Sequence, residues 1–240
     1  MDRYINIRMK KNKKILAIVP ARGGSKEIKL KNLKKVKGQS LICIVSKLIK
    51  KIKIIDRAVV STDNKKIASE AVKNGLVFYD FRPKKISGDT ASDIDVIHYT
   101  LKQTEKLEGK KYDIVVMLHP TSPLRKKKDV EGAINLLQKK KYDAVWTVSK
   151  TDTKFHPDKQ LLIKKGKLKY YSKKGQRIKY RQQLTTIYHR NSVAYVVNSN
   201  LLREKKLIMN NNTGAYIIKD EQISIDTLKD LSYVNKILRK

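Results

Sequence analysis

Short runs of apolar, mostly β-branched residues alternate in the first part of the chain with longer stretches in which apolar residues recur every three or four positions. These patterns predict strands at 15–21, 57–61, 76–79, 112–118 and 144–148, and helices at 40–53, 63–74, 92–107 and 129–139. The run at 112–118 is almost continuously apolar, which indicates a strand buried on both faces. Strands that alternate with helices are typical of βαβ units, so we predict an α/β fold with a doubly wound, mostly parallel sheet.

The pattern changes after Lys150. The next segment, 151–188, is polar, is rich in Lys, Tyr and Gln, and lacks helical periodicity, which indicates an inserted hairpin or arm. Regular patterns then resume, with strands predicted at 192–198 and 215–218 and an amphipathic helix at 227–238. We therefore divide the chain into a main domain, 1–150 and 189–240, and an inserted arm, 151–188.

The composition adds a strong positive charge to this picture. The 240 residues include 56 Lys plus Arg and 22 Asp plus Glu, which gives a net charge of +34, and 40% are hydrophobic, enough for a core. Lysines occur in nearly every segment, so we interpret them as a solvated surface and expect no specific nucleic-acid partner. The single cysteine, Cys43, excludes an internal disulfide. The charged amino terminus contains no long apolar segment, so we expect a cytoplasmic protein without a signal peptide or membrane span.

A glycine-rich loop follows the first predicted strand directly. Residues 20–26 (Pro-Ala-Arg-Gly-Gly-Ser-Lys) stand at the carboxyl end of that strand, where ligands bind in open α/β sheets. The two glycines let the backbone approach a phosphate, and Arg22, Lys26 and Lys31 can neutralise its charge. The spacing fits neither a Walker loop nor a dinucleotide fingerprint, and a tight structural turn explains the glycine pair equally well.

Together with later segments, this loop resembles the nucleotide-binding signature of the CMP-sialic acid synthetases, the acylneuraminate cytidylyltransferases. The further matching segments follow in order: Ser61-Thr62-Asp63, Arg82-Pro83 with Asp89-Thr90-Ala91-Ser92, Pro120-Thr121-Ser122-Pro123-Leu124-Arg125, Arg181-Gln182-Gln183-Leu184, Asn191 with Ala194-Tyr195, and Ile225-Asp226-Thr227 with Asp230-Leu231. Each segment is short, but chance does not account for so many in one order.

The resemblance implies a Rossmann-like nucleotidyltransferase that transfers CMP from CTP to the anomeric hydroxyl of a sialic-acid-like nonulosonic acid, releases pyrophosphate and requires Mg²⁺. Such phosphoryl transfer depends on positioning and on charge neutralisation. The implied nucleotide-binding residues are Ala21, Arg22, Gly23, Gly24, Ser25, Asn32, Arg82 and Ser92, and the implied catalytic residues are Arg22, Lys31 and Asp226. The implied sugar-binding residues are His119, Lys159, Arg181 and Tyr195, although Tyr195 can equally be a core residue and Lys159 and Arg181 surface side chains. In the family, the segment that contains Lys159 enters the neighbouring subunit's site, which implies a homodimer with a swapped dimerisation arm.

Asp226 is the expected metal ligand, because Mg²⁺ favours oxygen ligands and keeps waters and substrate phosphates as the rest of its shell. Asp226 also stands where it can cap the last predicted helix, and both roles are compatible. The family commonly has Asp-Ile-Asp here, whereas this chain has Ser224 at the first position. A water, Asp63 or Asp230 can compensate for the missing carboxylate.

Three further positions depart from the family pattern. Glu27 replaces a common Gly and adds negative charge beside the phosphate loop. His119 replaces a Gln that contacts the sugar, and it can bind the sugar, lie near the metal or be structural. Ser192 follows an Asn where the family often has Gly. The changes at His119 and Ser192 make legionaminic or pseudaminic acid as plausible a substrate as N-acetylneuraminic acid.

Three alternatives stay open at this point. Related synthetases that activate the eight-carbon acid Kdo share the fold, but the loop at 22–26 and the segment at 181–183 are of the sialic type. A catalytically weakened paralogue is suggested by Ser224 and Glu27. A basic polyanion-binding protein on an inactive transferase scaffold would show salt-dependent binding without CTP turnover.

Overall fold

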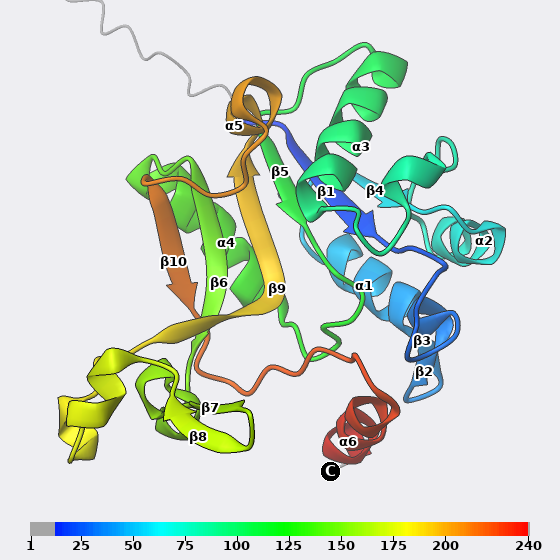
Figure 1. Ribbon diagram of the computed structural model, residues 1–240. Helices are drawn as coiled ribbons and strands as arrows, with labels where there is room; N and C mark the ends of the chain where they lie inside the picture. Colours follow the sequence, from blue (N-terminus) through cyan, green and yellow to red (C-terminus); the bar gives the residue numbers. More distant parts are fainter. Residues whose placement is uncertain (1–12, 240) are drawn as a thin grey trace, which may run out of the picture.

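A computed structural model of the chain describes residues 13–239 (Figure 1). The charged amino-terminal segment considered above, 1–12, lies outside the described residues. A six-stranded sheet forms the centre, in the order β10-β6-β9-β5-β1-β4. Its strands are β1 (Ile15–Pro20), β4 (Arg57–Ser61), β5 (Ile114–Met117), β6 (Ala144–Lys150), β9 (Tyr188–Asn198) and β10 (Thr213–Ile217). Only β9 runs against the others, because it pairs antiparallel with β5 and β6 while the remaining pairings are parallel, so the predicted mostly parallel sheet is confirmed.

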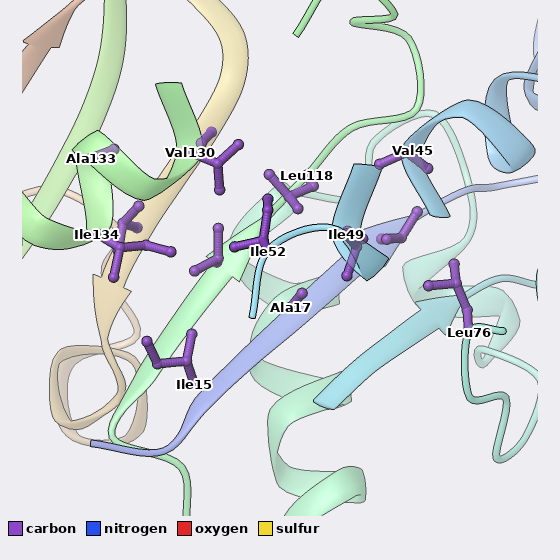
Figure 2. Close-up of a cluster of buried hydrophobic side chains, with 14 of the residues drawn as sticks. Ile15, Ala17, Val45, Ile49, Ile52, Leu76, Leu118, Val130, Ala133 and Ile134 are labelled. Carbon is purple, nitrogen blue, oxygen red and sulfur yellow. The ribbon is translucent and has the colours of Figure 1, made fainter. Parts of the chain in front are cut away.

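Helices cover both faces of this sheet, as expected for a doubly wound fold. They are α1 (Leu41–Lys50), α2 (Lys65–Lys73), α3 (Asp93–Glu108), α4 (Lys127–Lys140) and α5 (Ser199–Lys205). The last helix, α6 (Leu228–Arg239), lies away from the sheet and packs beside Val36 and Leu41 (Figure 1). Successive β1 side chains point to opposite faces: Ile15 and Ala17 join a core cluster with α1, α2 and α4 (Figure 2), whereas Leu16 and Ile18 pack with α3 and α5. Both faces of β1 are thus buried, which explains its continuous apolar run.

The last helix, α6, is capped by Thr227 and not by Asp226. The Thr227 hydroxyl accepts from the Asp230 amide at 3.2 Å, and the Asp230 carboxylate accepts from the Thr227 amide at 2.7 Å. This reciprocal pair is a capping box. The proposed capping role of Asp226 is therefore wrong, and its carboxylate is free for another partner.

Other elements differ from the sequence pattern. The segment predicted as a strand at 76–79 forms only an isolated bridge, between Val77 and Val59. The seven-residue helix α5 is too short to show periodicity, and a small two-stranded sheet, β2 (Lys35–Val36) with β3 (Gln39–Ser40), precedes α1. None of the described helices is long and apolar enough to cross a membrane.

The segment 151–188 leaves the sheet at the end of β6 and returns through β9 (Figure 1). It contains a hairpin of β7 (Leu161–Lys164) and β8 (Lys167–Tyr170) between the short 3₁₀ turns η3 (Thr153–Phe155), η4 (Pro157–Lys159), η5 (Lys173–Arg177) and η6 (Arg181–Gln183). Every residue of both hairpin strands is exposed in the single chain. Large apolar side chains are among them, including Leu161, Ile163, Leu168 and Tyr170.

Candidate active site

A cavity of about 500 Å³ opens where the central strands end, at their carboxyl edges. The loops after β1 and β5, the segment 82–91 before α3, the start of α3, the strand β9 and the segment before α6 contribute to its wall. Of the residues predicted from the sequence, the cavity is lined by Arg22, Ser25, Lys31, Asn32, Arg82, His119 and Asp226. Segments that lie far apart in the chain therefore meet at one place.

Two cations of the glycine-rich loop hold a carboxylate inside this cavity. An Arg22 Nη atom lies 2.7 Å from one oxygen of Asp89, and Lys26 Nζ lies 2.9 Å from the other. Hydrogen bonds from Lys26 and Arg22 hold the pKa of Asp89 below its usual range. Arg22 and Lys26 together thus have the geometry to bind two oxygens of one anion, and a phosphate has such a pair of oxygens. Asp89 belongs to one of the matching segments, but the sequence alone assigned it no role.

The two glycines of the loop differ in the space that a Cβ would have at each position. The Gly23 amide donates to Asp63 Oδ1 at 2.7 Å, and a Cβ at Gly23 would lie 2.8 Å from the Asn64 side chain that caps α2. Gly23 is therefore required by close packing against the end of β4. A Cβ at Gly24 would meet nothing within 4 Å. Both glycines line a neighbouring hollow and not the main cavity.

Other predicted nucleotide-binding groups bond the protein itself. The Ala21 amide donates to the Ser61 carbonyl at 2.9 Å and continues the pairing of β1 with β4. The Asn32 side chain donates to the Arg22 carbonyl at 3.1 Å, so it orients the loop from inside. The Ser92 hydroxyl caps α3 and does not line the cavity. These residues shape the site, and nothing tests their contact with a nucleotide.

Arg82 enters the cavity from a buried position. Only 5% of the residue is exposed, and its amide donates to the Thr62 carbonyl at 2.8 Å. Burial lowers the pKa of its guanidinium, and the charge of Asp63 opposes that effect. A cation that is already desolvated binds an anionic ligand strongly, because little water has to be removed from it.

Lys31 and Asp226 form the other charged pair of the site. Lys31 Nζ lies 2.7 Å from Asp226 Oδ1, and 66% of the Asp226 side chain is exposed. The described residues contain no group of three or more His, Cys, Asp or Glu side chains that could hold a metal ion. Asp63 accepts the Gly23 amide, and Asp230 accepts two amides before α6, so these two carboxylates are already engaged. A single carboxylate, that of Asp226, fits Mg²⁺, which takes most of its ligands from water and substrate phosphates.

His119 follows β5 and packs against the side chain of Tyr195. The rings meet edge to face at 6.0 Å, and His119 Nε2 lies 3.6 Å from Asp93 Oδ2. Burial lowers the pKa of His119, an effect that the charge of Asp93 opposes. Among the described residues, the buried Nε2 atom has no hydrogen-bond partner. Tyr195 itself lies in the core with 4% exposed, so it supports the cavity wall from behind.

Arg125 is a buried residue of the site to which the sequence analysis gave no role. Its guanidinium donates to the carbonyls of His119 at 2.7 Å and Ser192 at 3.2 Å, and also to that of Val193. Burial lowers the pKa of Arg125 to about 9, which leaves it charged at neutral pH. It therefore joins the loop after β5 to the strand β9 on the cavity wall. Its place in the matching segment 120–125 was the signal that the sequence offered.

Lys159 and Arg181 are exposed in the turns η4 and η6, and neither lines the cavity of its own chain. Their contact with the sugar stays a prediction, and it requires a second chain to bring an arm to the cavity.

Known proteins are similar to this chain in sequence and in fold. Residues 16–239 match the family model described as Cytidylyltransferase. The chain is 28% identical over 220 residues to the post-translational flagellin modification protein B of Campylobacter coli, covering 91% of this chain and 92% of that one. It is 27% identical over 228 residues to the pseudaminic acid cytidylyltransferase of Campylobacter jejuni, covering 95% and 97%. A CMP:2-keto-3-deoxy-manno-octonic acid synthetase, solved with CTP, superposes with a TM-score of 0.72 at 14% identity, covering 94% and 98%.

The structural likeness, at such low identity, concerns the fold alone and agrees with the predicted Rossmann-like architecture. The family match extends over nearly the whole chain, and it includes the glycine-rich loop, His119 and Asp226. The resemblance inferred from the sequence motifs is confirmed at this level. The chain belongs to the cytidylyltransferase family.

Proposed function

We propose that this protein transfers CMP from CTP to the anomeric hydroxyl of a sialic-acid-like nonulosonic acid and releases pyrophosphate. The observation that carries the proposal is one cavity that is lined both by the cations Arg22, Lys26, Lys31 and Arg82 and by the polar side chains of His119 and Ser192, in a cytidylyltransferase. The cations have the charge to bind a triphosphate, and the uncharged polar groups can bind a sugar.

The chemistry follows from the positions of these charges. The oxygen of the anomeric hydroxyl attacks the α-phosphorus and its proton is released to solvent. The bond from that phosphorus to the bridging oxygen breaks, and the electron pair leaves with pyrophosphate. Arg22 and Lys31 neutralise the oxygens that gain charge. Asp89 holds Arg22 and Lys26 in the free chain, so CTP has to displace that carboxylate before those two cations can bind phosphate.

We propose that the Asp226 carboxylate would hold Mg²⁺. When bound, Mg²⁺ supplies charge neutralisation at the triphosphate oxygens. Lys31, which is paired with Asp226 in the free chain, is then available for a phosphate. Ser224 also lines this part of the cavity and can bind a metal-held water through its hydroxyl.

A nonulosonic acid is favoured over Kdo by the relatives. A whole-length relative in Campylobacter jejuni is named for pseudaminic acid, whereas the Kdo synthetase shares only the fold. A cytoplasmic location belongs to the same proposal, because CTP is available there.

We propose further that the enzyme is a homodimer whose arm, 151–188, packs on a second copy. Large apolar side chains exposed on one hairpin mark a surface that another protein covers. Lys159 and Arg181 lie on this arm, so a second copy is also what can bring them to a sugar.

The experiment is a measurement of pyrophosphate release from CTP and Mg²⁺ with N-acetylneuraminic, legionaminic, pseudaminic and Kdo acids. Release with one of the three nonulosonic acids supports the proposal, and Arg22→Ala, which should lower the rate at limiting CTP, serves as the comparison variant. Release with Kdo alone would assign the protein to the runner-up reaction. Salt-sensitive nucleic-acid binding without turnover of any sugar would support the polyanion-binding alternative.

A further inference from the structure

Ser192 adopts a backbone conformation that is rare for its residue type. Its φ is +55°, in the left-handed region that glycine and asparagine enter most readily. It lies at a bulge of β9, where the register with β6 shifts between Trp146 and Val148. Such conformations persist only where the surroundings hold them, and they concentrate at binding sites.

Two buried side chains hold this conformation. The Ser192 carbonyl accepts from Ser122 Oγ at 3.0 Å and from an Arg125 Nη atom at 3.2 Å. The same Nη atom also donates to the His119 carbonyl at 2.7 Å. Because Arg125 is fully buried, its donors cannot exchange these carbonyls for water, and the bulge and the His119 loop are held together.

The Ser192 side chain is consequently part of the cavity wall. Its hydroxyl oxygen lies 3.5 Å from the Tyr195 hydroxyl, and the Tyr195 ring packs on His119. Glycine at this position would make the cavity wider here and would remove the hydroxyl from its wall. The chain thus keeps a side chain where its backbone conformation favours none, which points to a use for the side chain.

The charges around this wall select the part of the substrate that binds there. Asp93 Oδ2 lies 3.6 Å from His119 Nε2 and disfavours an anionic group next to that ring. The guanidinium of Arg125, which contacts this wall, already donates to the carbonyls of His119, Ser192 and Val193. The nearby donors and acceptors, Ser192, Tyr195 and the imidazole of His119, are uncharged when the imidazole is neutral. Phosphates and a sugar carboxylate are expected to bind the cations that line the cavity, Arg22, Lys26 and Arg82, instead.

We propose that Ser192 determines sugar specificity by hydrogen-bonding an uncharged hydroxyl or acylamino group of the sugar, and that Arg125 is the positioning residue that holds it there. This inference rests on the proposed function. It adds a selecting residue and the class of sugar group that this residue recognises.

Two substitutions at Ser192 separate its hydroxyl from its bulk. Ser192→Ala keeps the Cβ and loses the hydroxyl, so kcat/KM for the preferred sugar should fall roughly three- to tenfold, the usual effect of one neutral hydrogen bond. Ser192→Gly also removes the bulk and the unfavourable φ, so it should broaden the range of sugars used without lowering the Tm. KM for CTP should stay unchanged in both, and Ser69→Ala on the exposed surface of α2 is the matched control.

Arg125→Lys keeps a positive charge but loses the forked geometry. In the wild-type background it should reduce discrimination among the sugars and leave KM for CTP unchanged. In the Ser192→Gly background it should change discrimination no further, because the side chain that it positions is gone. A purely structural role would lower the Tm equally in both backgrounds and alter KM for CTP as well.

The outcomes distinguish this inference from the proposed function. If the wild type uses a nonulosonic acid and both Ser192 variants keep its ratios of kcat/KM among the sugars, this inference is overturned and the proposed function stands. If the wild type releases pyrophosphate with none of the sugars, both are overturned.

Discussion

Replacing Glu108 by Gln removes the only negative charge from a polar cluster at the end of α3, outside the cavity. The Glu108 carboxylate accepts from the hydroxyls of Tyr79 and Tyr112, and it lies 2.7 Å from Arg57 Nε and 3.0 Å from Lys110 Nζ. Only 10% of its side chain is exposed. The cluster joins α3 to the start of β4 and to the residues before β5, so its loss should weaken the fold and leave the site intact.

The size of the effect follows from the pKa of Glu108. Burial opposes ionisation, but the hydrogen bonds from Tyr112, Tyr79 and Lys110 outweigh it and lower the pKa from 4.5 to about 2. That difference corresponds to an upper value of about 3 kcal/mol of folding free energy. Because the folded-state pKa is depressed, this stability is present above pH 4.5 and is lost as the pH falls towards 2.

The assay is thermal unfolding of the wild type and Glu108→Gln at a series of pH values from 7 down to 3.5. At pH 7 the Tm should fall by up to roughly 6–12 °C, since about 1 kcal/mol shifts the Tm of a protein of this size by about 2–4 °C. The difference should shrink below pH 4.5. Glu131→Gln is the control, because Glu131 forms an exposed helical pair with Lys127 and its loss should shift the Tm by less than about 2 °C. A pH-independent difference, or none at pH 7, would refute the reasoning.

Four further outcomes are expected at the site and the arm. Arg22→Ala should raise KM for CTP roughly ten- to hundredfold in steady-state kinetics, because it removes a charged hydrogen bond to phosphate. Asp89→Asn should lower that KM, because its carboxylate no longer competes for Arg22 and Lys26. Asp226→Asn should raise the Mg²⁺ concentration for half-maximal rate about tenfold or more in a metal titration. Replacing 151–188 by a short linker should give a monomer by light scattering.

Three results would contradict the roles of Arg22, Asp226 and the arm. Lys139→Ala, in an exposed lysine run at the end of α4, is the control for the general loss of positive charge. If it matches Arg22→Ala, then phosphate binding by Arg22 is wrong. An unchanged metal titration for Asp226→Asn removes that residue from the metal site, and a linker variant with the mass of a dimer removes the arm from the interface.

Sequence patterns predicted most of the strands and helices because the apolar periodicity of each element is a local property of the sequence. The run that became β1 and the run that became β5 are examples, since burial on both faces requires apolar residues at every position. The prediction was wrong at 76–79, where an apolar segment forms one bridge with β4 and extends no further. A short apolar run carries no information about how many of its residues find a partner strand.

In the candidate site, too, local motifs predicted individual residues, whereas their partners lie far away in the sequence. Motifs alone pointed to Arg22, Lys31, His119 and Asp226, and these residues do line one cavity. Their partners came only from the fold. Lys31 pairs with Asp226 across 195 positions of sequence, and Arg22 pairs with Asp89 from a different loop.

Strand order is the physical reason for this difference. Residue types and spacing establish which groups can bind a phosphate, because that depends on charge and on local backbone geometry. Which groups meet depends on the sheet, where β9 lies antiparallel between β5 and β6 and so places Ser192 beside the loop of His119. Arg125 could bind three carbonyls only after these segments had been brought together. Local sequence therefore predicts the class of chemistry. Tertiary packing determines which side chains line the cavity wall where the sugar would be selected.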